Sequence, residues 1–378
     1  MHNYLYFCSQ KFIQMKAKSV INGFARTLLD WFRDNGRELP WRQTSDPYAI
    51  WLSEIILQQT QVKQGWDYWQ RFMLRWPTVD YLAAASEDEV LREWQGLGYY
   101  SRARNLHVAA RQIVALGHFP ETFDEIKQLK GVGDYTAAAI ASIAFGHPTA
   151  VVDGNVYRVL ARHFGIATPI NSTEGKKEFA ALAQSLMPEA SGTNGENICG
   201  LYNQAIMDFG AIQCTPQSPK CIVCPLQESC EALRSGKVSM LPIKQKTLKI
   251  KTRHLIYIYI RYQGETAIHR RGEGDIWQGL WEPLLVESGA RALLACYRRD
   301  ARKWKEKREM TADREIPHGK LIAKNVKHVL THQVLTVDFY LWEPNEHPQL
   351  PSDYIWIKES DIDNYAIPRL IDILLSKL

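Results

Sequence analysis

The stretch FDEIKQLKGVGDYTAAAIASIA, residues 123–144, decides the fold of the first half of the chain. Its pattern predicts a helix, a glycine turn and a second helix. Gly131 and Gly133 carry no Cβ, so the backbone of the turn can approach a partner closely. Because the second helix begins directly after the turn, its free N–H groups point at the turn and suit an anion such as a phosphate. A plain turn between two helices also favours glycine, so the motif needs support from elsewhere.

The helical pattern continues on both sides of this hairpin. From about Ser19 to Arg234, apolar residues recur every three or four positions and glycine or proline separates the runs. This predicts about ten short helices and almost no strands. After Gly236 the pattern changes to β-branched and aromatic residues. For this second half we predict strands at 254–262 and 326–342 and helices at 288–310 and 360–376.

A chain of 378 residues is longer than an ordinary single domain and suits two domains. We predict a mainly α N-terminal domain and an α+β C-terminal domain. The predicted divisions are an extension expected to be disordered at 1–18, a helical domain at 19–236, a basic linker at 237–253 and an α+β domain at 254–378. The linker has six basic residues and no acidic one, which favours contact with phosphates.

The composition is typical of a soluble globular protein, with 46% hydrophobic and 23% charged residues. No run approaches the roughly 18 apolar residues that span a bilayer. The first residues lack the apolar region and cleavage site of a secretory signal. We therefore expect a cytoplasmic location. The net charge of +5 is modest, so its distribution matters more than its sum.

Four of the seven cysteines lie close together with the spacing C-x6-C-x2-C-x5-C. They are Cys214, Cys221, Cys224 and Cys230. In a cytoplasmic chain such a group indicates metal binding rather than disulfides. Four thiolates suit either zinc or an iron–sulfur cubane. Only one pair is close here, and a cubane is wider than one ion, so the spacing favours a [4Fe–4S] cluster and leaves zinc as the alternative.

Two carboxylates stand in apolar surroundings. Asp153, in VVDGNVYRVLAR, precedes a helical run and suits an N-cap, which is worth about 1 kcal/mol. Glu54, in LSEIILQQTQV, would share one helical face with Gln58 and Gln61 and face a pocket. A partly desolvated carboxylic acid keeps its proton near neutral pH, whereas an ionised carboxylate stabilises a cation. Such a pair suits the cleavage of a glycosidic bond.

With these features placed, the chain resembles the MutY family of adenine DNA glycosylases, within the endonuclease III superfamily of helix–hairpin–helix glycosylases. The resemblance covers nearly everything from about Ser19 onward. Its motifs are WLSEIILQQTQV, WQGLGYYSRARNLH, LKGVGDYTAAAI, VVDGNVYRVLARHFG and the cysteine loop after QAIMDFGAIQC. It implies a monomeric base-excision-repair enzyme that removes adenine mispaired with 8-oxoguanine or guanine in double-stranded DNA. It also implies that the cluster is structural and redox-active rather than hydrolytic.

The resemblance implies a role for each catalytic residue. Glu54 would protonate the adenine and Asp153 would stabilise the sugar cation. Asn155 would help to position the water and the carboxylate. Tyr135 stands where bifunctional relatives carry a Schiff-base lysine. Tyrosine has no amine to attack the sugar, so the resemblance implies a monofunctional glycosylase, with Tyr135 packed near the reacting sugar.

The resemblance also implies how the chain would contact DNA. An enzyme that acts on a stacked base must flip it out and fill the gap, and Gln59 and Tyr99 would fill it. One of the adjacent Tyr99 and Tyr100 would instead pack in the core. The implied DNA-binding residues of the helical domain are Gln58, Gln59, Tyr99, Gly131 and Gly133.

The C-terminal domain resembles the Nudix-like domain that reads 8-oxoguanine. It lacks the acidic helix that binds magnesium in Nudix hydrolases, so we expect no pyrophosphatase activity. Leu330, Thr331 and His332 occupy the recognition loop of the family, where Leu330 replaces an aromatic ring. Thr331 and His332 keep groups that hydrogen-bond.

Two other hypotheses stay open on the sequence. One is a bifunctional thymine-glycol or mismatch glycosylase with lyase activity, against which the absent hairpin lysine argues. The other is a non-catalytic DNA-binding protein that uses the cluster as a redox sensor.

Overall fold

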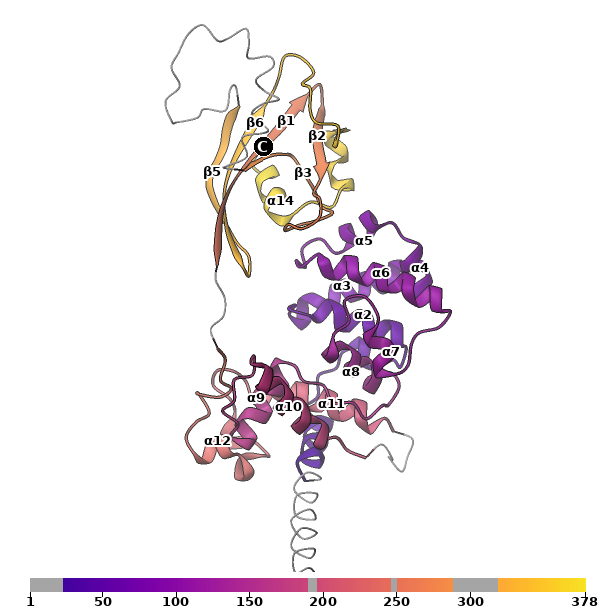
Figure 1. Ribbon diagram of the computed structural model, residues 1–378, viewed down its shortest axis with the longest axis vertical. Coiled ribbons are helices and arrows are strands. Elements are labelled where there is room, and N and C mark those ends of the chain that lie inside the picture. Colours follow the sequence, from indigo (N-terminus) through magenta and orange to yellow (C-terminus); the bar gives the residue numbers. More distant parts are fainter. Residues whose placement is uncertain (1–22, 190–195, 246–249, 288–318) are drawn as a thin grey trace, which may run out of the picture. The chain divides into compact units, whose positions relative to one another are not determined.

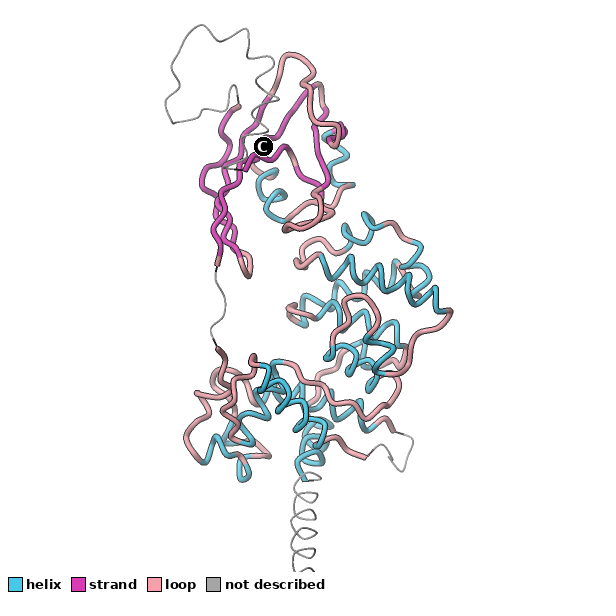
Figure 2. Tube along the Cα trace, in the orientation of Figure 1, coloured by secondary structure: helices cyan, strands magenta, loops and turns pink. Residues whose placement is uncertain are grey.

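The computed structural model describes residues 23–189, 196–245, 250–287 and 319–378. The chain divides into two compact units. One comprises the chain up to Ala84 together with Asn105–Lys246, and the other comprises Ala85–Arg104 together with Thr247–Leu378. The strands that the structure describes all lie in the second unit, in the C-terminal part of the chain (Figure 2).

Short helices make up the chain before residue 235, as its pattern predicts (Figure 1). Residues 23–35 form the first described helix. The helices that follow are α2 (Pro47–Leu57), α3 (Val62–Arg75), α4 (Val79–Ala84), α5 (Glu87–Glu93), α6 (Ser101–Leu116), α7 (Phe123–Lys127), α8 (Asp134–Ile143), α9 (Gly154–Phe164), α10 (Thr173–Ser185), α11 (Ile198–Asp208) and α12 (Glu231–Arg234). No helix among the described residues is both long and apolar enough to cross a membrane.

Helix α2 is buried on all sides. Asp46 caps its N-terminus by accepting from the Tyr48 N–H, and Pro47 occupies the first turn, where its missing N–H is harmless. Every residue from Tyr48 to Ile56 is buried, Glu54 included. A helix that is apolar all round belongs in a protein core, and α2 accordingly lies inside the helical unit.

Helix α2 ends earlier than its motif predicts. Its last residue is Leu57, and Gln58 is already extended, with ψ of 116°. Gln59 follows with a positive φ of 56°. The predicted helical face shared by Glu54, Gln58 and Gln61 is therefore wrong, because the chain turns after Leu57.

The predicted hairpin is formed by α7 and α8. Thr122 and Glu125 make a reciprocal capping box at the start of α7. Helix α8 begins directly after Gly133, as the glycine turn indicates. Gly131 has φ of +79°, and a Cβ there would lie 2.6 Å from the Cβ of Asn105. The turn thus requires glycine at this position for both conformation and space.

Part of the predicted linker packs on the helical unit. Leu241 is buried, and its carbonyl accepts from the Arg162 guanidinium. The carbonyl of Ile243 accepts from the N–H of Ile170. The first strand begins at Lys251, three residues before the predicted boundary. The buried Leu241 side chain explains why this part of the linker packs on the helical unit, since counting charges alone ignores the apolar residues between the lysines.

The second unit is built on a seven-stranded mixed sheet among the described residues. Its strands are β1 (Lys251–Tyr262), β2 (Glu265–Arg270), β3 (Trp281–Glu282), β4 (Leu284–Glu287), β5 (Lys320–Val329), β6 (Gln333–Trp342) and β7 (Tyr354–Lys358). The main order is β3-β2-β1-β6-β5, with β4 beside β1 and β7 beside β2. Strands β1 and β6 are parallel, and β5 and β6 form an antiparallel hairpin.

One face of this sheet packs against α14 (Arg369–Leu375). Leu255 and Tyr257 of β1 and Phe339 of β6 share a core with Leu370 and Leu374. The segment predicted as one helix, 360–376, is a 3-10 helix, Glu359–Asn364, followed by α14. The predicted strand 326–342 is in fact the hairpin of β5 and β6. The predicted helix 288–310 and the predicted extension 1–18 lie outside the described residues.

The two hairpin glycines allow a matched test. Gly131→Ala should lower the free energy of unfolding by about 1–3 kcal/mol, because it adds a Cβ at positive φ against Asn105. Gly133→Ala should change it by less than about 1 kcal/mol. Its φ is −97° and its Cβ position is open, so the weaker cap and the stiffer unfolded chain oppose each other. Urea unfolding measures both, and equal losses would contradict the role of the turn.

Candidate active site

The four predicted catalytic residues line one pocket in the helical unit. The pocket is open to solvent, and its empty volume is about 810 Å³ with the solvent at its mouth included. Glu54 comes from α2, Tyr135 from α8, and Asp153 and Asn155 from the start of α9. Arg42 of the 3-10 helix Pro40–Arg42 also lines it. The structure thus brings together residues that the sequence places far apart.

Glu54 is a buried acid. Its residue is 8% exposed, and its Oε2 accepts from the Tyr135 hydroxyl at 2.8 Å. Burial raises the pKa of Glu54 to about 7, against the hydrogen bond from Tyr135, which lowers it. The nearby Asp153 carboxyl also raises this pKa, and Arg42 lowers it. Glu54 therefore holds its proton up to about neutral pH.

Asp153 caps α9, as predicted. Its Oδ1 accepts from the N–H of Val156 at 2.7 Å, and its Oδ2 accepts from the Asn155 amide at 2.8 Å. Burial nevertheless raises the pKa of Asp153, although both hydrogen bonds lower it. The capping bonds oppose this rise in pKa without cancelling it, because burial has the larger effect. A positive charge on a sugar in the pocket would favour the ionised form.

Arg158 connects this cap to the cysteine loop, which sequence reasoning missed. Its guanidinium donates to Oδ1 of Asn155 at 2.8 Å and to the carbonyls of Cys214 and Gly210 at 2.7 and 2.6 Å. The only signal in the sequence was the spacing, since Asn155 and Arg158 lie three residues apart on a helix and face the same side. The orientation of Asn155 thus depends on the cysteine loop.

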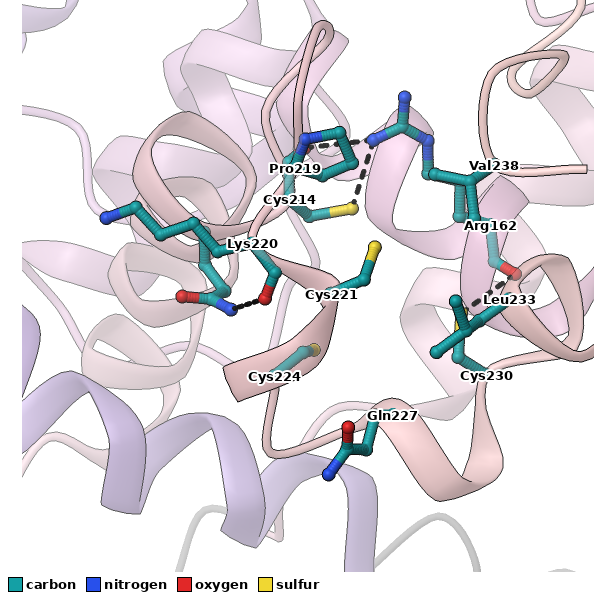
Figure 3. Close-up of a pocket in the computed structure, with 11 residues that line it drawn as sticks. Arg162, Cys214, Pro219, Lys220, Cys221, Cys224, Gln227, Cys230, Leu233 and Val238 are labelled. Carbon is teal, nitrogen blue, oxygen red and sulfur yellow. Dashed lines mark hydrogen bonds between the residues drawn. The ribbon is translucent and has the colours of Figure 1, made fainter. Parts of the chain in front are cut away.

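The four predicted cysteines surround one cavity next to α12 (Figure 3). The Arg162 guanidinium donates to Sγ of Cys214 at 3.4 Å and also to the carbonyls of Thr215 and Pro216. In the described part of the chain, no three His, Cys, Asp or Glu side chains lie close enough to hold a single metal ion. Four thiols around one cavity match the ligand set of an iron–sulfur cubane.

The two residues predicted to fill the gap left by a flipped base have unusual backbone conformations. Gln59 and Tyr99 have φ of 56° and 48°, although neither is glycine. Such conformations are strained and concentrate at functional sites. Tyr99 is 46% exposed whereas Tyr100 is 6% exposed, so Tyr100 is the core member of the pair. Gln58 donates to the Thr136 hydroxyl at 3.1 Å and so ties the end of α2 to the hairpin.

The predicted recognition loop lies at the tip of the β5–β6 hairpin. Thr331 and His332 are exposed, and Leu330 packs against the core of the sheet unit. The N–H of Leu330 donates to the carbonyl of Gln333, which closes the turn. The loop thus carries two exposed polar side chains, and the Thr331 hydroxyl is hydrogen-bonded to the Tyr99 hydroxyl.

Three family models match the chain. The HhH-GPD superfamily of base excision DNA repair proteins matches residues 52–188, and the iron–sulfur binding domain of endonuclease III matches residues 214–230. A NUDIX domain matches residues 256–377. The predicted fold class is confirmed, and so is the iron–sulfur cluster, with Cys214 and Cys230 at the ends of its matched segment. The zinc alternative is not supported.

Similar proteins from an animal and a bacterium carry the same name. An adenine DNA glycosylase of Buchnera aphidicola (subsp. Schizaphis graminum) is 34% identical over 261 residues, which cover 68% of this chain and 73% of that protein. The chain belongs to the adenine DNA glycosylase family. An adenine DNA glycosylase of the rat is 45% identical over 236 residues, which cover 59% of this chain. The matched region spans only 44% of the rat protein, so this chain covers less than half of the length of that family member.

A solved structure is similar to the helical part. A thermostable thymine-DNA glycosylase shares 31% identity with a TM-score of 0.52, over 58% of this chain and 99% of that one. The helical part of this chain therefore shares the fold of that thymine-DNA glycosylase.

Removal of one cluster ligand tests the cysteine assignment. Cys221→Ser should lose at least half of the bound iron and sulfide, together with the brown colour, because three thiolates hold the cluster less tightly than four. Cys199→Ser is the matched control, since Cys199 is buried outside the loop. Iron and sulfide analysis of both variants measures the effect. Full iron content in Cys221→Ser would show that the ligand is assigned wrongly.

Proposed function

We propose that this chain is a monofunctional DNA glycosylase that hydrolyses the N-glycosidic bond of adenine mispaired with 8-oxoguanine or guanine. The observation that carries the proposal is the buried Glu54, protonated near neutral pH, in one pocket with the capped Asp153. The relatives named adenine DNA glycosylase support adenine as the base.

The chemistry follows from the two carboxyl groups. Glu54 donates its proton to a ring nitrogen of adenine, the C1′–N bond breaks, and the electron pair leaves with the base. The sugar becomes cationic, and Asp153 stabilises it as a carboxylate. Asn155, which hydrogen-bonds Asp153, helps to place the water that adds to C1′. The proton released from that water restores Glu54, so atoms and charge balance.

Tyr135 explains why the product is a plain abasic site. Its phenol has no amine to attack C1′, and its hydroxyl is engaged with Glu54. It therefore orients the acid and forms no covalent bond with DNA. When bound, the iron–sulfur cluster cross-links the cysteine loop and supplies redox chemistry, and the hydrolysis uses only the side chains of the pocket.

In the proposed mechanism, three regions of the chain contact DNA. The hairpin turn at Gly131 and Gly133 offers N–H groups to a phosphate. Gln59 and Tyr99 fill the space that the flipped adenine leaves. The exposed Thr331 and His332, next to Leu330, contact 8-oxoguanine. The partner is thus a mispaired DNA duplex, bound by one copy of the chain.

The similarity to the thymine-DNA glycosylase favours a second candidate, a glycosylase for mispaired thymine. Both candidates use a base-flipping pocket and leave an abasic site. They differ in the base that is cut, so paired substrates separate them.

The first test uses three duplexes with adenine opposite 8-oxoguanine, adenine opposite guanine and thymine opposite guanine. We expect an alkali-labile site at the adenine of the first two and no adduct after borohydride treatment. An intact adenine strand would refute the proposal. Cleavage at thymine would favour the second candidate, a trapped adduct would favour the bifunctional lyase, and binding without any cut would favour the redox-sensing protein.

The second test removes each carboxyl group. Glu54→Gln and Asp153→Asn should each slow base release about 100-fold to 10,000-fold, the usual contribution of an acid or base, while duplex binding persists. Asparagine caps a helix as well as aspartate, so Asp153→Asn should fold normally. Glu121→Gln, on an exposed residue, is the control and should keep full activity. Normal turnover in either variant would remove that residue from the mechanism.

The third test follows the rate with pH. The active form has Glu54 protonated, and its pKa is raised to about 7. Single-turnover rates should therefore fall about tenfold per pH unit above roughly pH 7, as the acid loses its proton. A rate that stays constant from pH 7 to 9 would contradict the role of Glu54 as the acid.

A further inference from the structure

A further buried carboxyl group, that of Asp208, bonds to Arg42, which lines the pocket. Asp208 is the last residue of α11 and is 0% exposed. It accepts hydrogen bonds from the backbone N–H and the side chain of Arg37 and from the side chain of Arg42. The Arg42 contacts are bidentate, with Nη1 to Oδ2 and Nη2 to Oδ1, both at 2.8 Å. Sequence reasoning did not select any of these three residues.

Asp208 is ionised at any working pH. Burial raises its pKa, but the hydrogen bonds from Arg42 and Arg37 outweigh burial and lower the pKa to about 2. A buried charge of this kind persists only when it is paired and hydrogen-bonded. Its partner Arg42 is 13% exposed at the side chain, whereas the Arg37 side chain is 31% exposed. Arg42 is therefore the partner that water screens less.

Arg42 is also a neighbour of Glu54. Both line the same pocket, and the arginine charge acts to lower the pKa of Glu54. The other groups that act on Glu54 are the Tyr135 hydroxyl from α8 and Asp153 at the start of α9. The Arg42 charge favours the ionised form of Glu54, and an anion bound to the guanidinium weakens that effect.

We propose that Asp208 is a positioning residue for the acid catalyst: it fixes the Arg42 guanidinium and compensates the positive charge of that group beside Glu54. The inference rests on the proposed role of Glu54. In this salt bridge the nitrogen atoms of the Arg42 guanidinium face the Asp208 carboxylate, so the arginine charge in the pocket is paired. The same contact joins the 3-10 helix Pro40–Arg42 to the end of α11, where the π-helix Phe209–Gln213 leads into Cys214.

The experiment compares the pH dependence of single-turnover adenine release in the full, cluster-loaded chain. Asp208→Asn leaves Arg42 uncompensated, so the upper midpoint of the profile should move down by about one pH unit. Arg42→Gln removes the charge, so its midpoint should move up. The double variant should return close to the wild-type midpoint, and Asp208→Glu should restore it. Arg37→Gln, which keeps the Arg42 pair, is the matched control with a smaller shift.

A purely structural role predicts a different pattern. Asp208→Asn would then lower the rate equally at every pH with an unchanged midpoint, and that result would overturn the proposal. If Asp208→Asn does not fold, Arg42→Gln decides alone: an upward shift supports the proposal, and an unchanged midpoint overturns it.

The rate of Glu54→Gln as a function of pH, compared with that of the wild type, separates this inference from the proposed function. If Glu54→Gln keeps the upper midpoint of the wild type, Glu54 is not the acid and the proposed mechanism fails. If Glu54→Gln abolishes that midpoint while Asp208→Asn and Arg42→Gln leave it in place, only the role of Asp208 fails.

Discussion

The burial of one carboxyl group within α2 is the constraint on which the site depends. A helix surrounded by core on all sides removes Glu54 from water, and this desolvation keeps the proton on the acid. The hydrogen bond from Tyr135 and the charge of Arg42 have the opposite effect, because both lower the pKa of Glu54. Asp208 pairs with Arg42 and so offsets one of these two opposing effects.

The second carboxyl group shows how one side chain serves stability and chemistry together. Asp153 satisfies the free N–H groups at the start of α9, and this contact fixes its oxygen atoms in the pocket. Asn155 and Arg158 extend the contact to the carbonyl of Cys214. The cysteine loop thus supports the geometry of the pocket through its backbone carbonyls.

Prediction succeeded where the physical cause is local. Glycine at Gly131 and the start of α8 follow from the turn, and the cap at Asp153 follows from the residue and the helix after it. Prediction failed where the chain leaves its pattern. The periodicity predicted a helix that continues past Leu57. The chain instead turns at Gln58 and Gln59, because tertiary contacts such as that of Gln58 with Thr136 outweigh helix propensity.

The sequence by itself determined which half of the chain is helical and which forms strands, together with the glycine turn, the helix cap and the four-cysteine loop, because each depends on residues a few positions apart. Only the tertiary structure decided which distant groups meet. Tyr135 reaches Glu54 across 81 positions, and Arg37 reaches Asp208 across 171. Their pairing, and with it the charge state of the acid, depends on how the buried helices pack, and no spacing along the chain records that arrangement.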